Sequence, residues 1–255
     1  METRILVVNP NSSKSMTVSL RETIEKTFSM ESCKISYFTG PETSPPQIDG
    51  QETSIKSMEA CLPLLIDDQE SVYYFQKFNG ILIACFSDHP LVAKIKDRAA
   101  KEKADVSIVG LLDSSINYCN LVGKKFSIIT SNKEWIPILN NSVESKFLTG
   151  NTVNKNLWKG TVSTDLQVLD LHSPENFQQI AEIIHRENIR KLDSDIVILG
   201  CAGFSGLQNK LAKTFQRDGT LFLDTIEIGL TDSNHYDKIC QLTKINRNMI
   251  VFYRV

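Results

Sequence analysis

Two cysteines, Cys85 and Cys201, each end a short run of aliphatic residues. Cys85 follows the run GILIA at residues 80–84, and Cys201 follows DIVILG at residues 195–200. Runs of this length, bounded by glycine and polar residues, are typical of strands buried on both faces of a parallel sheet. Because ligands bind at the carboxyl ends of such strands, both thiols are predicted to lie where chemistry takes place.

A single cysteine in this position usually packs as a small apolar residue. Two cysteines at equivalent positions favour proton exchange at an acidic carbon, in which one thiolate removes a proton and the other thiol protonates the opposite face. A helix N-terminus lowers the pKa of a cysteine, so we expect one of the two to ionise near neutral pH. Backbone N–H groups at the glycine-rich turn would stabilise the enolate, and the reaction needs no cofactor.

Alternating strands and helices predict an α/β fold with mostly parallel sheets that position these thiols. The chain also contains an approximate internal repeat: ILVVNPN at 5–11 resembles FSIITSN at 126–132, and GILIACFSDHP at 80–90 resembles IVILGCAGFSG at 196–206. The repeat predicts two similar lobes that each contribute one cysteine to the cleft between them. We assign residues 1–108 to the first lobe, completed by 225–255, and residues 109–224 to the second.

Composition and charge indicate an ordinary globular protein, and the paired thiols predict a small-molecule substrate as its partner. The 255 residues are 41% hydrophobic and 23% charged, and 28 basic residues nearly balance 30 acidic ones. This balance gives no electrostatic reason to expect nucleic acid or an anionic membrane as a partner. No apolar run approaches the roughly 20 residues that span a bilayer, and the N-terminus carries no signal-peptide pattern.

The spacing of cysteines and histidines favours neither disulfides nor a metal. The six cysteines form no C-x-x-C pair, which suits reduced thiols in the cytoplasm (33, 61, 85, 119, 201 and 240). The four histidines show no metal-ligand spacing (89, 172, 185 and 235). His89, Asp113 and Asp224 each stand at the start of an expected helix, so we interpret them as helix caps rather than catalytic groups.

Three loops and the C-terminus complete the expected organisation. The proline-rich segment 40–50 is predicted to form a wall or lid, and the two asparagines of residues 9–11 favour a turn. Helical segments are expected over 51–78, a polar loop over 150–160 and a strand over 161–171. A helix reaching about residue 242 and an edge strand at 249–253 are expected to end the chain.

Five motifs resemble those of the aspartate/glutamate/hydantoin racemase superfamily and, within it, a fungal-like member of the hydantoin and allantoin racemase branch: NPNSSKSMT (9–17), GPETSPPQIDG (40–50), ACFSDHP (84–90), IITSN (128–132) and ILGCAGFSGL (198–207). The resemblance implies two pseudo-symmetric Rossmann-like lobes with the active site between them. It also implies cofactor-independent racemisation at C5 of a hydantoin ring, such as allantoin or a 5-substituted hydantoin, in nitrogen catabolism, with Cys85 and Cys201 as the two bases.

The same resemblance implies which residues hold the ring. They are Asn9, Thr130, Ser131 and the backbone around Phe86 and Gly200. After Cys85 the family usually has a Gly-Asp-Pro type turn, whereas this chain has SDHP at residues 87–90. We also expect a homo-oligomer.

Two other functions remain open. One is a same-superfamily isomerase or decarboxylase in which a cysteine attacks the substrate covalently. The other is a non-catalytic sensor of a small nitrogen compound. Two further motif interpretations fail on spacing. Gly200, Gly203 and Gly206 do not form the G-x-G-x-x-G of dinucleotide sites, and residues 203–207 lack the second glycine of a nucleophile elbow.

Overall fold

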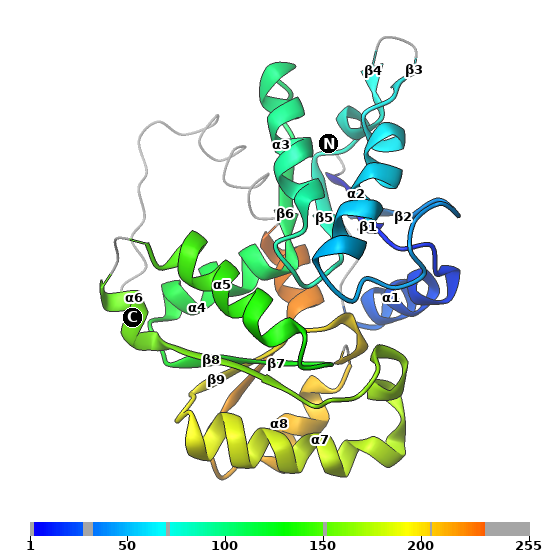
Figure 1. The fold of residues 1–255 in the computed structure, drawn as a ribbon. Coiled ribbons are helices and arrows are strands. Elements are labelled where there is room, and N and C mark those ends of the chain that lie inside the picture. Colours follow the sequence, from blue (N-terminus) through cyan, green and yellow to red (C-terminus); the bar gives the residue numbers. More distant parts are fainter. Residues whose placement is uncertain (1–2, 28–32, 70–71, 150–151, 205, 233–255) are drawn as a thin grey trace.

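The computed structural model describes residues 3–27, 33–69, 72–149, 152–204 and 206–232, which form two four-stranded sheets (Figure 1). In each sheet every pair of neighbouring strands is parallel. The strands of the first sheet, in spatial order, are β2 (Cys33–Thr39), β1 (Thr3–Asn9), β5 (Gly80–Ile83) and β6 (Ser107–Gly110). Those of the second are β8 (Trp158–Ser163), β7 (Phe126–Thr130), β9 (Ile196–Leu199) and β10 (Leu221–Asp224).

The two sheets have the same strand order, which confirms the predicted α/β class and the two similar lobes. In each sheet the first strand of the chain pairs with the second on one side and with the third on the other. The order therefore reverses between β1 and β5, and again between β7 and β9. A crevice opens at the carboxyl ends of the strands at such a reversal, and ligands bind there. Cys85 follows β5 and Cys201 follows β9, so both lie beside these reversals.

The strands form where the sequence is continuously aliphatic. In β1, Ile5 and Val7 belong to one buried cluster, whereas Leu6 and Val8 belong to another on the opposite face. This alternation is the two-residue period of a strand covered on both sides. The cluster of Ile5 and Val7 also contains Ile128 from the second sheet. A single core therefore joins the facing sides of the two lobes.

Eight labelled helices cover the sheets. They are α1 (Lys14–Thr27), α2 (Gln51–Leu65), α3 (Pro90–Lys101), α4 (Leu111–Val122), α5 (Trp135–Phe147), α6 (Thr152–Leu157), α7 (Phe177–Ile183) and α8 (Gln208–Thr214). In Figure 1, α4 and α5 lie on one side of the second sheet, and α7 and α8 lie on the other. Residues 225–232 are helical, and a Cβ on Gly229 would lie 2.7 Å from Leu82 Cδ1 of β5. This last helix therefore packs against the first sheet.

Shorter elements complete the fold. They are a hairpin of β3 (Asp68–Gln69) and β4 (Val72–Tyr73), the 3₁₀ turns η1 (Tyr74–Lys77), η2 (Val168–His172), η3 (Pro174–Asn176) and η5 (Ala202–Phe204), and the π-helical segment η4 (Ile184–Lys191), which continues α7.

Three expected elements differ from those observed. The helical stretch predicted over 51–78 ends at Leu65 and is followed by the hairpin and η1. The expected polar loop at 150–160 contains α6, and the strand expected at 161–171 begins earlier and ends at Ser163. Asp165 takes a left-handed conformation (φ 59°), which a strand cannot continue through. The helix expected beyond residue 232 and the strand at 249–253 lie outside the described residues, and the lobe boundaries remain a prediction.

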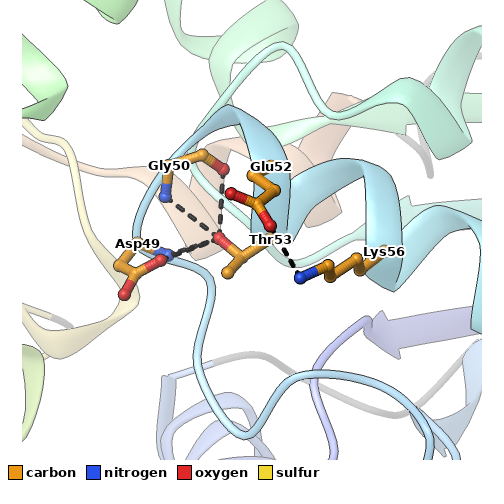
Figure 2. Close-up of polar contacts among 5 residues, drawn as sticks. All are labelled: Asp49, Gly50, Glu52, Thr53 and Lys56. Carbon is orange, nitrogen blue, oxygen red and sulfur yellow. Dashed lines mark hydrogen bonds and ion pairs between the residues drawn. The ribbon is translucent and has the colours of Figure 1, made fainter.

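The proline-rich loop is fixed to the start of α2 by one threonine (Figure 2). The hydroxyl of Thr53 accepts hydrogen bonds from the backbone N–H groups of Asp49 and Gly50, at 3.0 and 3.1 Å, and donates to the Asp49 carboxylate at 2.8 Å. Glu52 and Lys56 form an exposed ion pair one turn apart, at 2.7 Å. These contacts satisfy the backbone N–H groups that immediately precede α2 and hold the end of the loop beside the cleft.

Candidate active site

Both cysteines line one cavity of about 50 Å³ between the two lobes. Residues from the first lobe and from the second contribute to its wall. The lining residues are Asn11, Met16, Gln47, Ile48, Ala84, Cys85, Phe86, Thr130, Ser131, Trp135, Val168, Gly200 and Cys201. The cavity thus lies where the carboxyl ends of β5, β7 and β9 approach one another.

Asn9 is the predicted site residue that does not line this cavity, whereas the other six all do. Asn9 is 1% exposed, and its side-chain amide donates to Asn11 Oδ1 at 2.9 Å, to Thr17 Oγ1 at 3.0 Å and to the Ser13 carbonyl at 3.1 Å. The NPN turn therefore presents Asn11 to the cavity and uses Asn9 to hold it. The spacing alone could not distinguish the two asparagines.

Besides Asn11 and Ala84, which lie within two residues of predicted ones, five lining residues are not among those predicted from the sequence. Met16 comes from α1, Gln47 and Ile48 from the proline-rich loop, Trp135 from the start of α5 and Val168 from η2. The loop at 40–50 does form a wall, as expected. The remaining positions depend on which side of a helix or turn faces the cleft, which no local pattern encodes.

A single carbonyl ties the NPN turn to its surroundings. The oxygen of Pro10 accepts hydrogen bonds from Ser44 Oγ at 2.6 Å, Ser57 Oγ at 2.7 Å and Cys61 Sγ at 3.3 Å. Gly40 lies so close that a Cβ would be 2.7 Å from the same oxygen. These contacts fix the turn, the proline-rich loop and α2 to one another, so the wall that carries Asn11 and Ile48 is rigid.

Cys85 lies deep in the molecule but keeps some accessible surface because it faces the cavity. Its sulfur is 3.5 Å from Ser87 Oγ, within hydrogen-bonding distance. Burial raises the pKa of the Cys85 thiol to about 12, the Ser87 hydroxyl opposes that rise, and the charge of a Cys201 thiolate would increase it.

Cys201 has a donor of a different kind. The backbone N–H of Gly203 points at its sulfur from 3.4 Å. Burial raises the pKa of Cys201 to about 11, while the Gly203 N–H and the Ser131 hydroxyl both lower it. Cys201 therefore has two groups that favour its ionised form, whereas Cys85 has one.

Both shifts are opposite to the expected lowering by a helix N-terminus, and the positions of the helices explain why. The helix after Cys85 is capped by His89, and α8 begins only at Gln208. The field of a helix terminus falls off within about one turn, so neither thiol feels it strongly. Removal from water then dominates both pKa values.

Gly200 lies where a residue of the first lobe packs against a strand end of the second. A Cβ there would lie 2.5 Å from Ile128 Cγ2, 2.9 Å from Phe86 Cε1 and 3.0 Å from the Ile129 carbonyl oxygen. The Thr130 hydroxyl donates to the Gly200 carbonyl at 3.3 Å. The absent side chain allows Phe86, from the first lobe, to pack directly on the strand end that precedes Cys201.

The three groups interpreted as helix caps have distinct environments. His89 Nδ1 accepts from the Leu91 N–H at 3.3 Å, and Asp224 Oδ1 accepts from the N–H groups of Ile226 and Glu227, so these two caps are confirmed. Asp113 instead lies inside the first turn of α4 and pairs with Lys146 at 2.8 Å, so its expected role as a cap is wrong.

Lys146 joins the two lobes. Its ammonium group also contacts Asp88 Oδ1 at 2.6 Å, and Asp88 lies in the loop that begins at Cys85. Burial lowers the pKa of Lys146, but its hydrogen bonds to the two carboxylates outweigh that effect and the net direction is upward. The ion pair between Lys146 and Asp88 therefore fixes the loop after Cys85 to α5.

A second, larger depression lies beside the cavity. It has a volume of about 600 Å³ and is lined by the start of α2, the loop after Cys85 and one side of α5. Trp135 lines both spaces and Ser87 lines this one. We name this depression the side groove, and its hydroxyl and amide side chains come from Gln51, Ser54, Ser87, Asn141, Ser142 and Ser145.

The part of the chain that the structure describes contains neither a cluster of metal ligands nor a membrane-spanning helix. Among the described residues, no three His, Cys, Asp or Glu side chains gather as a metal site requires. In the same part of the chain, no helix combines the length and apolar character needed to cross a bilayer.

Comparison with known proteins agrees with this architecture. The sequence is 99% identical over 230 residues to Protein DCG1 of Saccharomyces cerevisiae, covering 90% of this chain and 94% of that protein. It is 25% identical over 227 residues to a hydantoin racemase of Paenarthrobacter aurescens, covering 88% of this chain and 86% of that enzyme. The fold resembles that of allantoin racemase from Klebsiella pneumoniae, with a TM-score of 0.74, 20% identity, and coverage of 95% of this chain and 89% of that one.

The family model described as Asp/Glu/Hydantoin racemase matches residues 5–232. That range includes both sheets, the NPN turn and both cysteines. This chain belongs to the Asp/Glu/hydantoin racemase family.

Proposed function

We propose that the chain is a cofactor-independent racemase that inverts C5 of a hydantoin-like ring, with allantoin as the preferred substrate. One observation carries the proposal: two thiols from equivalent strand ends, Cys85 and Cys201, line the same cavity. Relatives named hydantoin racemase and a similar fold named allantoin racemase support the choice of substrate class.

In the proposed reaction, Cys201 as thiolate removes the C5 proton, and the electron pair passes to the adjacent carbonyl to give an enolate. The Cys85 thiol then donates its proton to the opposite face of C5 and becomes the thiolate. One C–H bond breaks and one forms, and the two cysteines exchange protonation states. The reverse reaction starts from that exchanged state. The Gly203 N–H and the Ser131 hydroxyl both favour the ionised form of Cys201, which supports Cys201 as the thiol that ionises first.

The cavity and the side groove bear on the substrate. An engineered cavity of about 150 Å³ binds benzene, and the 50 Å³ between the thiols is much smaller, so we propose that it widens to admit a substituted five-membered ring. The side groove begins next to Ser87 and Trp135, and its wall also contains apolar side chains from Ile55, Pro90, Pro137 and Ile138. Its serine and asparagine side chains suit a ureido group, which offers several hydrogen-bond donors and an acceptor. These polar groups are the reason for proposing allantoin as the preferred substrate.

We also propose the setting of this activity. Cys33, Cys61, Cys85, Cys119 and Cys201 are free thiols, which fits the reducing conditions of the cytoplasm. Allantoin is a nitrogen-rich ring, so interconversion of its enantiomers would serve nitrogen catabolism. A homo-oligomer remains part of this proposal.

The test follows the ellipticity of one allantoin enantiomer, with a 5-benzyl hydantoin in parallel. The wild type should remove the signal well above the buffer rate and act faster on allantoin. Cys85→Ser and Cys201→Ser should each reduce the rate to background, whereas Cys119→Ala, a buried cysteine in α4, should retain it. Background rates with every hydantoin tried would refute the proposal.

Two outcomes would support the other candidate functions. A mass increase equal to the substrate on Cys85 or Cys201 would indicate covalent catalysis, as in the fold neighbour described as a maleate cis-trans isomerase with a covalently bound succinylcysteine intermediate. Tight binding of allantoin with no loss of ellipticity would indicate a sensor.

A further inference from the structure

In each lobe, the residue two positions after the cysteine places a hydrogen-bond donor near its sulfur, but the donor atoms differ. For Cys201 that residue is Gly203, whose backbone N–H lies 3.4 Å from the sulfur. For Cys85 it is Ser87, whose side-chain hydroxyl lies 3.5 Å from the sulfur. The repeat thus preserves the position of the donor and changes its chemistry.

The local backbone explains the difference. The N–H of Ser87 donates to the carbonyl of Cys85 at 3.0 Å, which closes a tight turn and leaves no amide for the sulfur. After Cys201 the corresponding carbonyl instead accepts from Phe204, so the Gly203 N–H is free to reach the thiol. A side chain at Gly203 has no room, because a Cβ would lie 2.6 Å from the Val168 carbonyl oxygen. The residue two positions after each cysteine therefore donates through its backbone in one lobe and through its side chain in the other.

We propose that Ser87 is a positioning residue that holds the Cys85 sulfur toward the cavity and stabilises its thiolate by donating the hydroxyl proton. The inference rests on the proposed two-thiol reaction and assigns Ser87 a role in it. Ser87 is 5% exposed, so water competes little for its hydroxyl. A hydrogen bond to an ionised partner is stronger than one between neutral groups, so the contact gains strength as Cys85 ionises. The direction of its effect on the pKa of Cys85 agrees, since the hydroxyl opposes the rise caused by burial.

The test measures thiol reactivity rather than turnover. The folded protein is treated briefly with iodoacetamide between pH 7 and 9, and alkylation of Cys85 and Cys201 in the same molecules is quantified by peptide mass spectrometry. The ratio of the two rates cancels any change in the opening of the cleft. If Ser87→Ala raises the pKa of Cys85 by about one unit, the thiolate population of Cys85 falls about tenfold, while the higher intrinsic nucleophilicity of that thiolate offsets part of the loss. The rate of Cys85 alkylation divided by that of Cys201 should therefore fall about threefold in Ser87→Ala. Ser87→Thr, which keeps the hydroxyl, should restore it.

Ser115→Ala is the matched control, because this buried serine donates to the Leu111 carbonyl within α4 and should leave the ratio unchanged. An unchanged ratio in Ser87→Ala would overturn the proposal. An equal fall in Ser87→Ala and Ser87→Thr would also overturn it, since packing and not the hydroxyl would then be responsible. Alkylation is measured without substrate, so failure of the allantoin assay would leave this result interpretable.

Discussion

Replacing Gly200 by alanine tests the close contact between the lobes. The new methyl group would lie 2.5 Å from Ile128 Cγ2 and 2.9 Å from Phe86 Cε1. Carbon atoms in contact normally lie about 3.5–4.0 Å apart, so these side chains or the strand end must shift by about 1 Å. Overpacking of this kind costs about 1–3 kcal/mol. For a chain of this length each kcal/mol corresponds to about 2–4 °C in Tm, which predicts a decrease of about 2–12 °C.

The assay is thermal unfolding followed by circular dichroism, with racemisation measured at 25 °C on the same samples. Gly50→Ala is the matched control, because its backbone is extended and a Cβ there meets nothing within 4 Å. That control should change the Tm little, since the gain of about 0.4–1 kcal/mol from restricting the unfolded chain is offset by the weaker preference for alanine at an N-cap. A Gly200→Ala variant with the stability and activity of the wild type would refute the description of this contact.

Three further predictions follow from the charges and thiols. Because burial raises the pKa of Cys201 to about 11 and that of Cys85 to about 12, kcat/KM should rise about tenfold per pH unit from pH 7 to 9 as the thiolate fraction grows. A kcat/KM that does not change over this pH range would contradict the raised pKa values. Burial lowers the pKa of His89 to about 4, so between pH 6.5 and pH 4 only the unfolded chain binds a proton at this residue, and the free energy of unfolding of the wild type should fall by up to about 3 kcal/mol. His89→Asn can still cap α3 and should not show this loss when unfolding in urea is measured at both pH values. Lys146→Met should lower the free energy of unfolding by about 1–2 kcal/mol, because two carboxylates lose a partly exposed cation, and this difference from the wild type should become smaller at high salt. A difference that is the same at all salt concentrations would indicate an effect of packing instead.

The central part of the fold could be predicted from the sequence because its signals are local and repeated. The aliphatic runs before Cys85 and Cys201 identify buried parallel strands, and their similarity implies equivalent places in two lobes. The equal strand orders of the two sheets confirm that inference. The helix caps at His89 and Asp224 were likewise predictable, since capping depends on neighbouring backbone groups.

Other features depend on contacts between distant segments and could not be predicted. Asp113 has the sequence context of a cap, but Lys146 on another helix determines its role. Asn9 and Asn11 are alike in sequence, yet the cavity lies beside Asn11 alone. The predicted lowering of the cysteine pKa values is wrong, because these values depend on burial and on where the helices begin, and both are tertiary properties.

Isotope labelling tests the two-thiol reaction most directly. One enantiomer of allantoin is incubated with the enzyme in D₂O, and the reaction is stopped at low conversion. The two enantiomers are then separated, and the deuterium content of each is measured by mass spectrometry. If Cys85 and Cys201 act from opposite faces, the inverted product should carry deuterium at C5 while the recovered substrate keeps protium. Deuterium in both enantiomers to the same extent would mean that a single base serves both faces and would contradict the two-thiol reaction.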